Sequence, residues 1–155
     1  KSMSMIHEML YQSHDISKIE YGKYIQKLIS ELVVSMKGEK HNIKLVIDVP
    51  DIKLDINTSI PLSLLVNEVV TNALKYGILD DAEGEIHFKM RKIDDEKYQL
   101  FIGDNGIGYD QKNEQEPTTL GLKLIDRLVA QLDGQIEKIN DESGSNYKII
   151  FQEID

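Results

Sequence analysis

The sequence lacks cysteine, an excess of basic residues and a long apolar run, and each absence excludes a class of protein. Without cysteine the chain can form neither a disulfide framework nor a thiolate metal site. A formal net charge of −9 argues against broad electrostatic binding to nucleic acid or anionic membrane, since both need clustered lysine and arginine. No apolar run approaches the roughly 20 residues of a membrane span, and no signal peptide is visible.

These absences lead us to expect a cytoplasmic location. The first residue, Lys1, is not an initiator methionine, so we expect a piece of a longer protein. Segments outside this piece could anchor that protein in a membrane.

The residues that are present suit one domain in which helices are segregated from a largely antiparallel sheet, an α+β layer sandwich. Apolar residues at three- and four-residue steps predict helices, and alternation predicts strands. The expected helices are the end of one at Lys1–Tyr11, then Tyr21–Met36, Pro61–Tyr76 and Thr119–Leu132. The expected strands are Ile43–Val49, Glu85–Arg91, Tyr98–Ile102, Gln135–Asn140 and Tyr147–Ile154. The polar segment Asp110–Thr119 has no periodicity and is expected to be a mobile loop.

One candidate site lies on the third expected helix, which Pro61 should open and Gly77 should end. Glu68 and Asn72 are four residues apart, so they share a helix face, together with Lys75 and Tyr76. A carboxylate, a carboxamide and an ammonium on one face can hold hydrated Mg²⁺ on a polyphosphate, with an asparagine oxygen as the direct ligand. An ordinary solvated helix face explains the same residues, and this segment alone leaves both interpretations open.

A second candidate is the sequence Asp104-Asn105-Gly106-Ile107-Gly108, directly after a strand. Two glycines let the backbone approach a flat ligand closely, and a carboxylate there can accept a hydrogen bond from the exocyclic amine of adenine. Asn-Gly is also a hairpin signal, although no alternating return strand follows. A calcium loop is excluded because the later acidic ligands are absent. A P-loop is excluded because its glycine and lysine pattern occurs nowhere in the chain.

A third candidate is Thr118-Thr119-Leu120-Gly121-Leu122-Lys123, at the expected start of the last helix. A threonine cap, a glycine and free amides at a positive helix end can bind phosphate. An ordinary capped helix explains the segment equally well when it is taken alone.

The order and spacing of the three candidates resemble the GHKL ATPase superfamily, which includes gyrase, mismatch-repair and chaperone ATPases and the histidine kinases. The resemblance implies a Bergerat fold, a two-layer α/β sandwich whose mixed, mostly antiparallel sheet packs on three helices, with ATP and Mg²⁺ as ligands. It implies that Asn72 is the Mg²⁺ ligand and that Asp104 reads adenine, in a pocket shaped by Gly106 and Gly108. The remaining implied nucleotide contacts are Lys75, Tyr76, Thr119, Leu120, Gly121, Leu122 and Ser145.

The first third of the chain favours one branch of that superfamily. The stretch Met5–Ser13, followed by Asp15-Ile16 and Gly22-x-Tyr24-Ile25, resembles the junction that precedes the ATP-binding domain in one subfamily of sensor histidine kinases. It implies that residues 1–17 end a dimerisation and phosphoacceptor segment and that residues 18–155 form the catalytic domain. His7 is not expected to be the acceptor, because in this subfamily the acceptor lies on an earlier helix.

The resemblance therefore implies a protein-histidine kinase fragment that binds Mg·ATP and lacks its own acceptor histidine. Expected partners are ATP, the phosphoacceptor helix of the same kinase, a response regulator and, in the longer protein, a second copy; nucleic acid is not expected. Glu68 is the second candidate catalytic residue beside Asn72, and Tyr76 departs from the family, which usually has histidine there. Two alternatives stay open: an ATPase in which Glu68 activates water, and a pseudokinase that docks partners through Tyr21–Met36.

Overall fold

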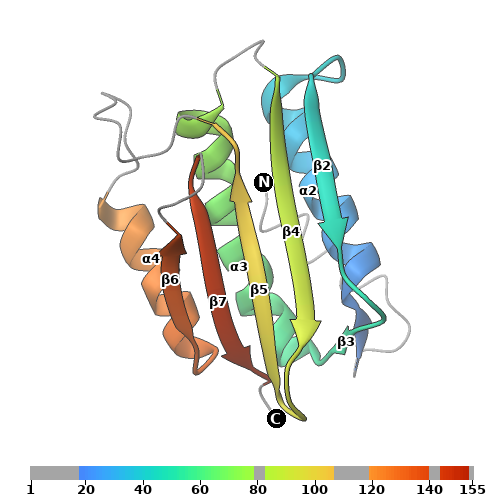
Figure 1. Cartoon of the computed structure of the whole chain (residues 1–155), viewed down its shortest axis with the longest axis vertical. Coiled ribbons are helices and arrows are strands. Elements are labelled where there is room, and N and C mark those ends of the chain that lie inside the picture. Colours follow the sequence, from blue (N-terminus) through green and yellow to red (C-terminus); the bar gives the residue numbers. More distant parts are fainter. Residues whose placement is uncertain (1–17, 79–82, 107–118, 140–143, 154–155) are drawn as a thin grey trace.

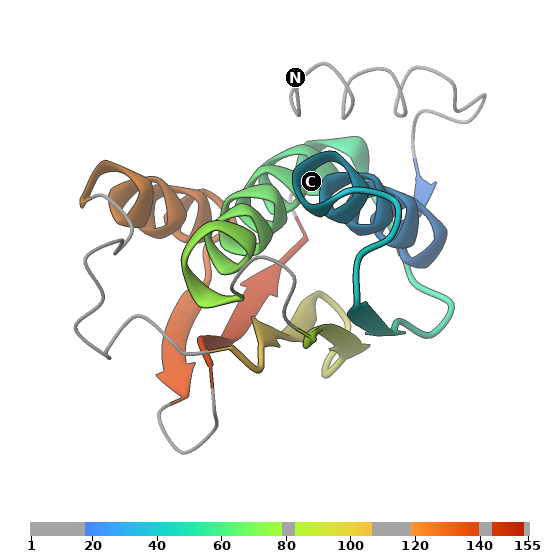
Figure 2. The same ribbon diagram turned by 90° about the horizontal axis from the view of Figure 1, so that it is seen from above.

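The computed structural model describes residues 18–78, 83–106, 119–139 and 144–153, which form a layer of helices against one side of a sheet (Figures 1 and 2). The three α-helices are α2 (Tyr21–Lys37), α3 (Ile56–Asn72) and α4 (Thr119–Gln131). The sheet has the order β2-β4-β5-β7-β6. Its strands are β2 (Ile43–Asp48), β4 (Gly84–Lys92), β5 (Lys97–Asp104), β6 (Gln135–Ile139) and β7 (Asn146–Gln152). None of the described helices is long and apolar enough to span a bilayer.

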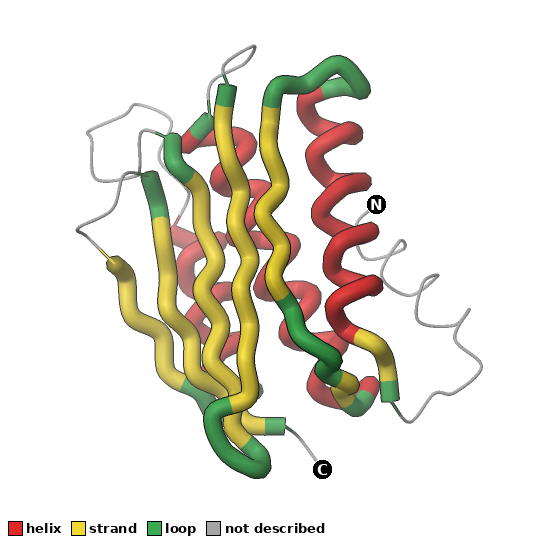
Figure 3. Tube along the Cα trace, turned by 45° about the vertical axis from the view of Figure 1, so that its right-hand side comes forward, coloured by secondary structure: helices red, strands yellow, loops and turns green. Residues whose placement is uncertain are grey.

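The sheet is mixed but mostly antiparallel, so the predicted α+β sandwich is confirmed. Only β2 and β4 run parallel, and the other three strand pairs are antiparallel. Along β4, Ile86, Phe88 and Met90 are buried against the helices, while the residues between them face the other side. This period of two places the apolar half of each strand in the core. All three helices cover that one face and leave the other face bare (Figure 3).

Helix α2 follows its predicted bounds closely because its apolar residues recur on one face. Tyr21, Ile25, Leu28 and Ile29 are completely or almost completely buried. The helix ends before Gly38, whose φ of 90° lies in the left-handed region that glycine adopts without strain.

Helix α3 begins earlier than predicted, so the assignment of Pro61 to its first position is wrong. The helix starts at Ile56, and the Asp55 side chain caps it by accepting a hydrogen bond of 2.7 Å from the Asn57 N–H. Pro61 therefore lies inside the helix, where its ring is buried in the core. Because proline in the second turn removes only one early hydrogen bond, the cap and the buried face outweigh it.

The end of α3 also differs from a regular helix. After Asn72 the chain widens into a π-helical turn, η1 (Ala73–Gly77), closed by the Ile78 N–H donating to the Ala73 carbonyl at 2.8 Å. Gly77 ends the helix as predicted. The wider turn changes the spacing, so Lys75 and Tyr76 do not continue the α-helical face of Glu68 and Asn72 as the sequence pattern assumed.

The turn after α4 shows a second departure. The residue in the left-handed conformation there is Asp133, with φ of 50°, although a glycine, Gly134, follows it directly and would suit such a turn better. Gly134 is required for a different reason, because a Cβ at this position would lie 2.4 Å from the Ile150 carbonyl oxygen. Glycine is therefore needed at position 134 because the backbone of β7 lies too close for a side chain.

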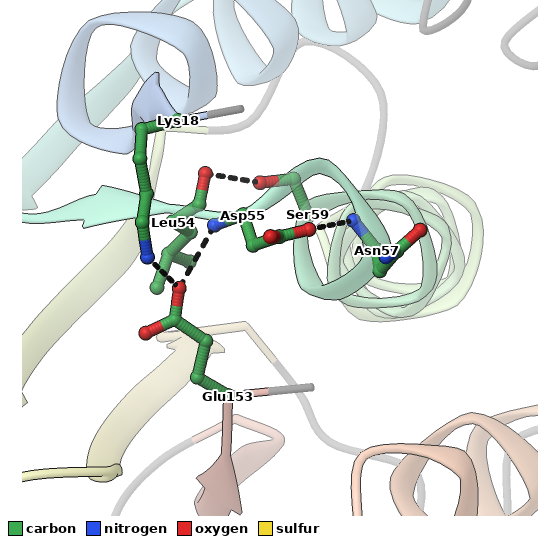
Figure 4. A network of polar contacts seen from close by, with 6 residues as sticks. All are labelled: Lys18, Leu54, Asp55, Asn57, Ser59 and Glu153. Atoms are coloured by element: carbon green, nitrogen blue, oxygen red, sulfur yellow. Dashed lines mark hydrogen bonds and ion pairs between the residues drawn. The ribbon is translucent and has the colours of Figure 1, made fainter. Parts of the chain in front are cut away.

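Two short strands missing from the prediction, β1 (Ile19–Glu20) and β3 (Lys53–Leu54), pair with each other beside α2. At this end of the molecule Glu153 joins three segments (Figure 4). Its Oε2 accepts hydrogen bonds from the Lys18 Nζ at 2.5 Å and from the Asp55 N–H at 3.0 Å. The Glu153 carboxylate therefore ties the residue before β1 and the cap of α3 to the end of β7.

We expect Glu153→Ala to lower the free energy of unfolding by about 1–2 kcal/mol, because the Asp55 N–H loses its acceptor. Glu153→Gln should cost less than half of that, since the amide oxygen still accepts this hydrogen bond. Lys18→Met should cost about 0.5 kcal/mol or less, because the Lys18 side chain is 45% exposed and its ion pair is screened. Urea unfolding of the three variants measures the order, and equal losses for Ala and Gln would show that the charge matters more than the hydrogen bond.

Candidate functional site

The Asp104 carboxylate is the centre of the candidate site. Asp104 ends β5 on the helix-facing side of the sheet and is 1% exposed. Its Oδ1 accepts a hydrogen bond of 2.7 Å from the Gly106 N–H, whereas its buried Oδ2 has no hydrogen-bond partner among the residues that the structure describes. A buried carboxylate oxygen without a donor is costly unless a ligand supplies one.

Burial and hydrogen bonding act on this carboxylate in opposite directions. Burial raises the pKa of Asp104, and the backbone N–H groups of Gly106 and Ser145 and the charge of Lys138 lower it, which together bring the pKa from 3.8 to about 6. The net direction is upward because the desolvation of the charged form dominates. Asp104 is thus poised to titrate just below neutral pH.

Three glycines bring backbone against Asp104 from three segments. A Cβ at Gly77 would lie 3.0 Å from the Asp104 Oδ1, and one at Gly106 would lie 2.1 Å from the Gly77 carbonyl oxygen. At Gly144, where φ is +83°, a Cβ would lie 2.0 Å from the Asp104 carbonyl oxygen. These positions exclude larger residues, so the π-helical turn, the end of β5 and the start of β7 close around one carboxylate.

The segment Asp104–Gly106 is not a hairpin turn. Among the described residues the next strand along the chain is β6, which pairs with β7 and not with β5. Asn105 instead extends the pairing with β4, because its Oδ1 accepts from the Glu85 N–H at 2.7 Å. The hairpin interpretation of this sequence is therefore wrong.

Asn72 lies at the end of α3, directly before the π-helical turn that contacts Asp104. It is 5% exposed, and its Nδ2 is buried without a hydrogen-bond partner. The oxygen and nitrogen of an amide exchange places by rotation, so this side chain is free to offer either atom. An asparagine oxygen is a suitable Mg²⁺ ligand, and the role of Asn72 as that ligand stays a prediction.

The other predicted residues of this helix differ in their exposure. Glu68 and Tyr76 are half-buried, and Tyr76 packs against the hydrophobic core. Lys75 is exposed, so its ammonium group is available to a ligand at the surface. Among the described residues no group of three or more histidine, aspartate or glutamate side chains could hold a metal, so a cation here would depend on Asn72 and the ligand's own oxygens.

Ser145 lies beside the carboxylate, as the resemblance implied. It is 1% exposed, and its carbonyl accepts a hydrogen bond of 3.2 Å from the Asp104 N–H. The prediction for Gly108 lies outside the described residues. For Thr119–Leu122 the structure describes the helix, which starts at Thr119 as predicted, but not the side chains.

The sequence pattern missed Lys138, Gly144 and the second role of Gly77. Lys138 lies on β6 and lowers the pKa of Asp104 through its charge, although 34 positions of chain separate the two residues. Gly77 was predicted only as a helix stop, and Gly144 only as a neighbour of Ser145. No local signal identifies these roles, because strand pairing and the π-helical turn create the contacts.

A buried carboxylate with a free oxygen, glycines pressed against it and an uncommitted asparagine on the adjoining helix define a nucleotide-binding domain of the α+β class. Residues 57–154 match the model of the family described as histidine kinase-, DNA gyrase B-, and HSP90-like ATPase. The chain belongs to this family. Residues 1–36 match a second family model, described as histidine kinase. The predicted resemblance to the ATP-binding domain of sensor histidine kinases is therefore confirmed.

Relatives and solved structures agree with this assignment. The chain is 25% identical over 150 residues to blue-light-activated histidine kinase 2 of Erythrobacter litoralis (strain HTCC2594), covering 89% of this chain and 42% of the relative. The chain thus spans less than half of the length of that protein. The histidine kinase domain of the E. litoralis EL346 blue-light-activated histidine kinase has a similar fold, with a TM-score of 0.78, 21% identity and coverage of 97% and 73%. The mycobacterial sensor histidine kinase MprB gives a TM-score of 0.64 at 18% identity, with coverage of 90% and 98%.

The raised pKa of Asp104 predicts how the stability of the nucleotide-free domain depends on pH. Between about pH 4 and pH 6 the folded state retains a proton that the unfolded state has lost, so stability falls as the pH rises through this window. Asp104→Asn cannot ionise and should gain up to about 3 kcal/mol over the wild type across it, at about 1.4 kcal/mol per pKa unit.

Urea unfolding at about pH 4.5 and pH 7.5 measures this difference. The exposed Asp51→Asn supplies a matched aspartate-to-asparagine change away from the site. If wild type and Asp104→Asn show the same pH dependence, Asp104 is ionised in both folded and unfolded states and the assignment of its environment is wrong.

Proposed function

We propose that this chain is the catalytic domain of a sensor histidine kinase, which binds Mg·ATP and passes the γ-phosphoryl group to a histidine on a helix outside the described residues. The observation that carries the proposal is the Asp104 carboxylate, whose Oδ2 is buried without a partner. The exocyclic amine of adenine is the donor that this oxygen fits, since guanine presents a carbonyl at the same position. Family membership supports ATP as the nucleotide.

The phosphate end of the nucleotide would lie toward α3. Asn72 would present its side-chain oxygen to the Mg²⁺ ion, and the exposed Lys75 would contact the phosphates. A bound Mg²⁺ would offset negative charge on the phosphates, which matters in a chain of formal charge −9. Tyr76, Thr119, Leu120, Gly121 and Leu122 are proposed as further nucleotide contacts, with Gly108 beside the adenine.

Transfer to histidine rather than to water rests on the beginning of the chain. The match of residues 1–36 to the histidine kinase model favours a kinase over an ATPase of the same superfamily. In a kinase, Glu68 would orient the incoming histidine or the hydrated Mg²⁺ rather than activate water. The phosphoacceptor helix, a response regulator and a second copy of the longer protein are the proposed partners, in the cytoplasm.

We expect this chain to bind Mg·ATP in calorimetry without releasing phosphate over multiple turnovers. Glu68→Ala and the matched control Glu31→Ala, another half-buried helix glutamate, should likewise release no phosphate. In the longer protein, label from the γ-phosphate should appear as acid-labile phosphohistidine. Multiple-turnover release that Glu68→Ala abolishes and Glu31→Ala preserves would identify an ATPase and contradict the kinase assignment.

A further inference from the structure

The face of the sheet opposite the helices, here called the open face, is uncovered in the part of the chain that the structure describes (Figures 2 and 3). A sheet face that only meets water usually carries small or polar residues. The open face instead has the half-buried Phe101 at its centre, on β5, and Val46, Ile139 and Ile150 on the strands around it. It combines apolar surface with charge and differs from an ordinary solvated face.

The strand register arranges five side chains in one row across the open face. Lys89 on β4 and Lys148 on β7 lie directly opposite Phe101 on either side. Asp48 pairs with Lys89 at one edge, and Glu137 pairs with Lys148 at the other. The Phe101 ring therefore lies between two lysines, and the neighbour of each lysine on the outer strand of the sheet is an acidic residue.

Two hollows adjoin Phe101. One, of about 460 Å³, is lined by Val46, Ile139 and Tyr147 among others and reaches the strand end at Asp104 and Asn105. The second, of about 350 Å³, lies on the other side of Phe101 and includes Lys89 and Arg91 in its lining. A ligand surface with a protruding apolar side chain can enter either hollow while its flanks meet the cations.

The open face does not share the acidic excess of the chain, because its cations Lys44, Lys89, Arg91 and Lys148 outnumber its acids Asp48, Glu85 and Glu137. Lys89, Arg91 and Lys148 form no ion pair with any residue that the structure describes. They lie on β4 and β7, the two strands on either side of β5, in a protein whose formal net charge is −9. Cations grouped around an aromatic residue complement carboxylates grouped around an apolar side chain.

The dimensions of the cationic area limit what can occupy it. Adjacent strands are about 4.8 Å apart, so Lys89 and Lys148 are separated by about 10 Å, and the row from Asp48 to Glu137 spans about 19 Å. A nucleic acid strand crossing the sheet would bring phosphates against both acidic ends of the row. A short acidic protein segment fits between them.

We propose that the open face docks an acidic segment of a partner protein, with its carboxylates on Lys89, Arg91 and Lys148 and an apolar side chain against Phe101. Phe101 and the three cations lie on the face opposite the one that holds the Asp104 side chain, and the first hollow extends from this face to Asp104. The inference does not depend on the reaction proposed above, because none of these side chains belongs to the nucleotide site.

The experiment uses ¹⁵N-labelled protein and the blocked peptide Glu-Glu-Leu-Glu-Glu-Leu-Glu-Glu as the probe. We expect amide shifts confined to β2, β4, β5 and β7, and affinity that falls as salt is raised. The glutamine analogue of the peptide should bind at least tenfold more weakly. Lys89→Glu with Lys148→Glu should reduce affinity at least tenfold, whereas Lys27→Glu, on the exposed side of α2, should leave it unchanged.

Thermal unfolding of each variant shows that the sheet is intact, and Phe101→Ser tests the apolar contact separately. Shifts that fall outside the open face, or equal binding of the glutamine analogue, would overturn the proposal. Equal or tighter binding of an oligothymidylate of the same charge would identify a nucleic-acid surface instead. Shifts of the open face that depend on protein concentration without peptide would identify a second copy as its occupant.

Discussion

The burial of one carboxylate organises the rest of this molecule. Asp104 is nearly inaccessible, and one of its oxygens has no donor, which in a folded interior is an unfavourable arrangement. The surrounding backbone fits it closely, because Gly77, Gly106 and Gly144 allow three segments to approach without side chains. A folded protein keeps such a cost where a ligand removes it. Backbone from the end of α3, the end of β5 and the start of β7 therefore packs around the Asp104 carboxylate.

The two faces of the sheet differ in what they carry, and only one of them holds the Asp104 side chain. The helix-facing side holds the Asp104 side chain, and all three helices, including α3 with Asn72 at its end, cover this side. The opposite side carries Phe101 between Lys89 and Lys148. Because strand β5 contributes to both faces, a partner on one side would contact the same strand that ends in the nucleotide-binding carboxylate. Asn105, which lines the first hollow, directly follows Asp104.

The sequence predicts the fold well where local periodicity determines it. Helix α2 and the five strands of the main sheet lie within a few residues of their expected bounds, since each has an apolar face that must be buried. Pro61 misled the prediction for α3 because the Asp55 cap, and not the proline, sets where that helix begins. The pairing of β1 with β3 was missed because strands of two residues carry no alternation.

The candidate site was predictable only in part. Asp104, Asn72 and Ser145 follow from a spaced motif that a family resemblance can recognise. The contribution of Lys138 depends on the pairing of β6 with β7, and that of Gly77 depends on the π-helical turn. Neither feature has a signal in the neighbouring sequence, because both arise from contacts between distant segments. The roles of Lys138 and Gly77 follow from their positions next to the Asp104 carboxylate in the folded structure.

The central claim is that the Asp104 carboxylate selects adenine through its exocyclic amine. Calorimetry of Mg·ATP and Mg·GTP with the unmodified chain near pH 7.5 tests it most directly, since the two ligands carry the same phosphates. We predict that Mg·ATP binds at least tenfold more tightly, because guanine would place a carbonyl against the unpartnered carboxylate oxygen. Equal affinities for the two nucleotides would contradict the account.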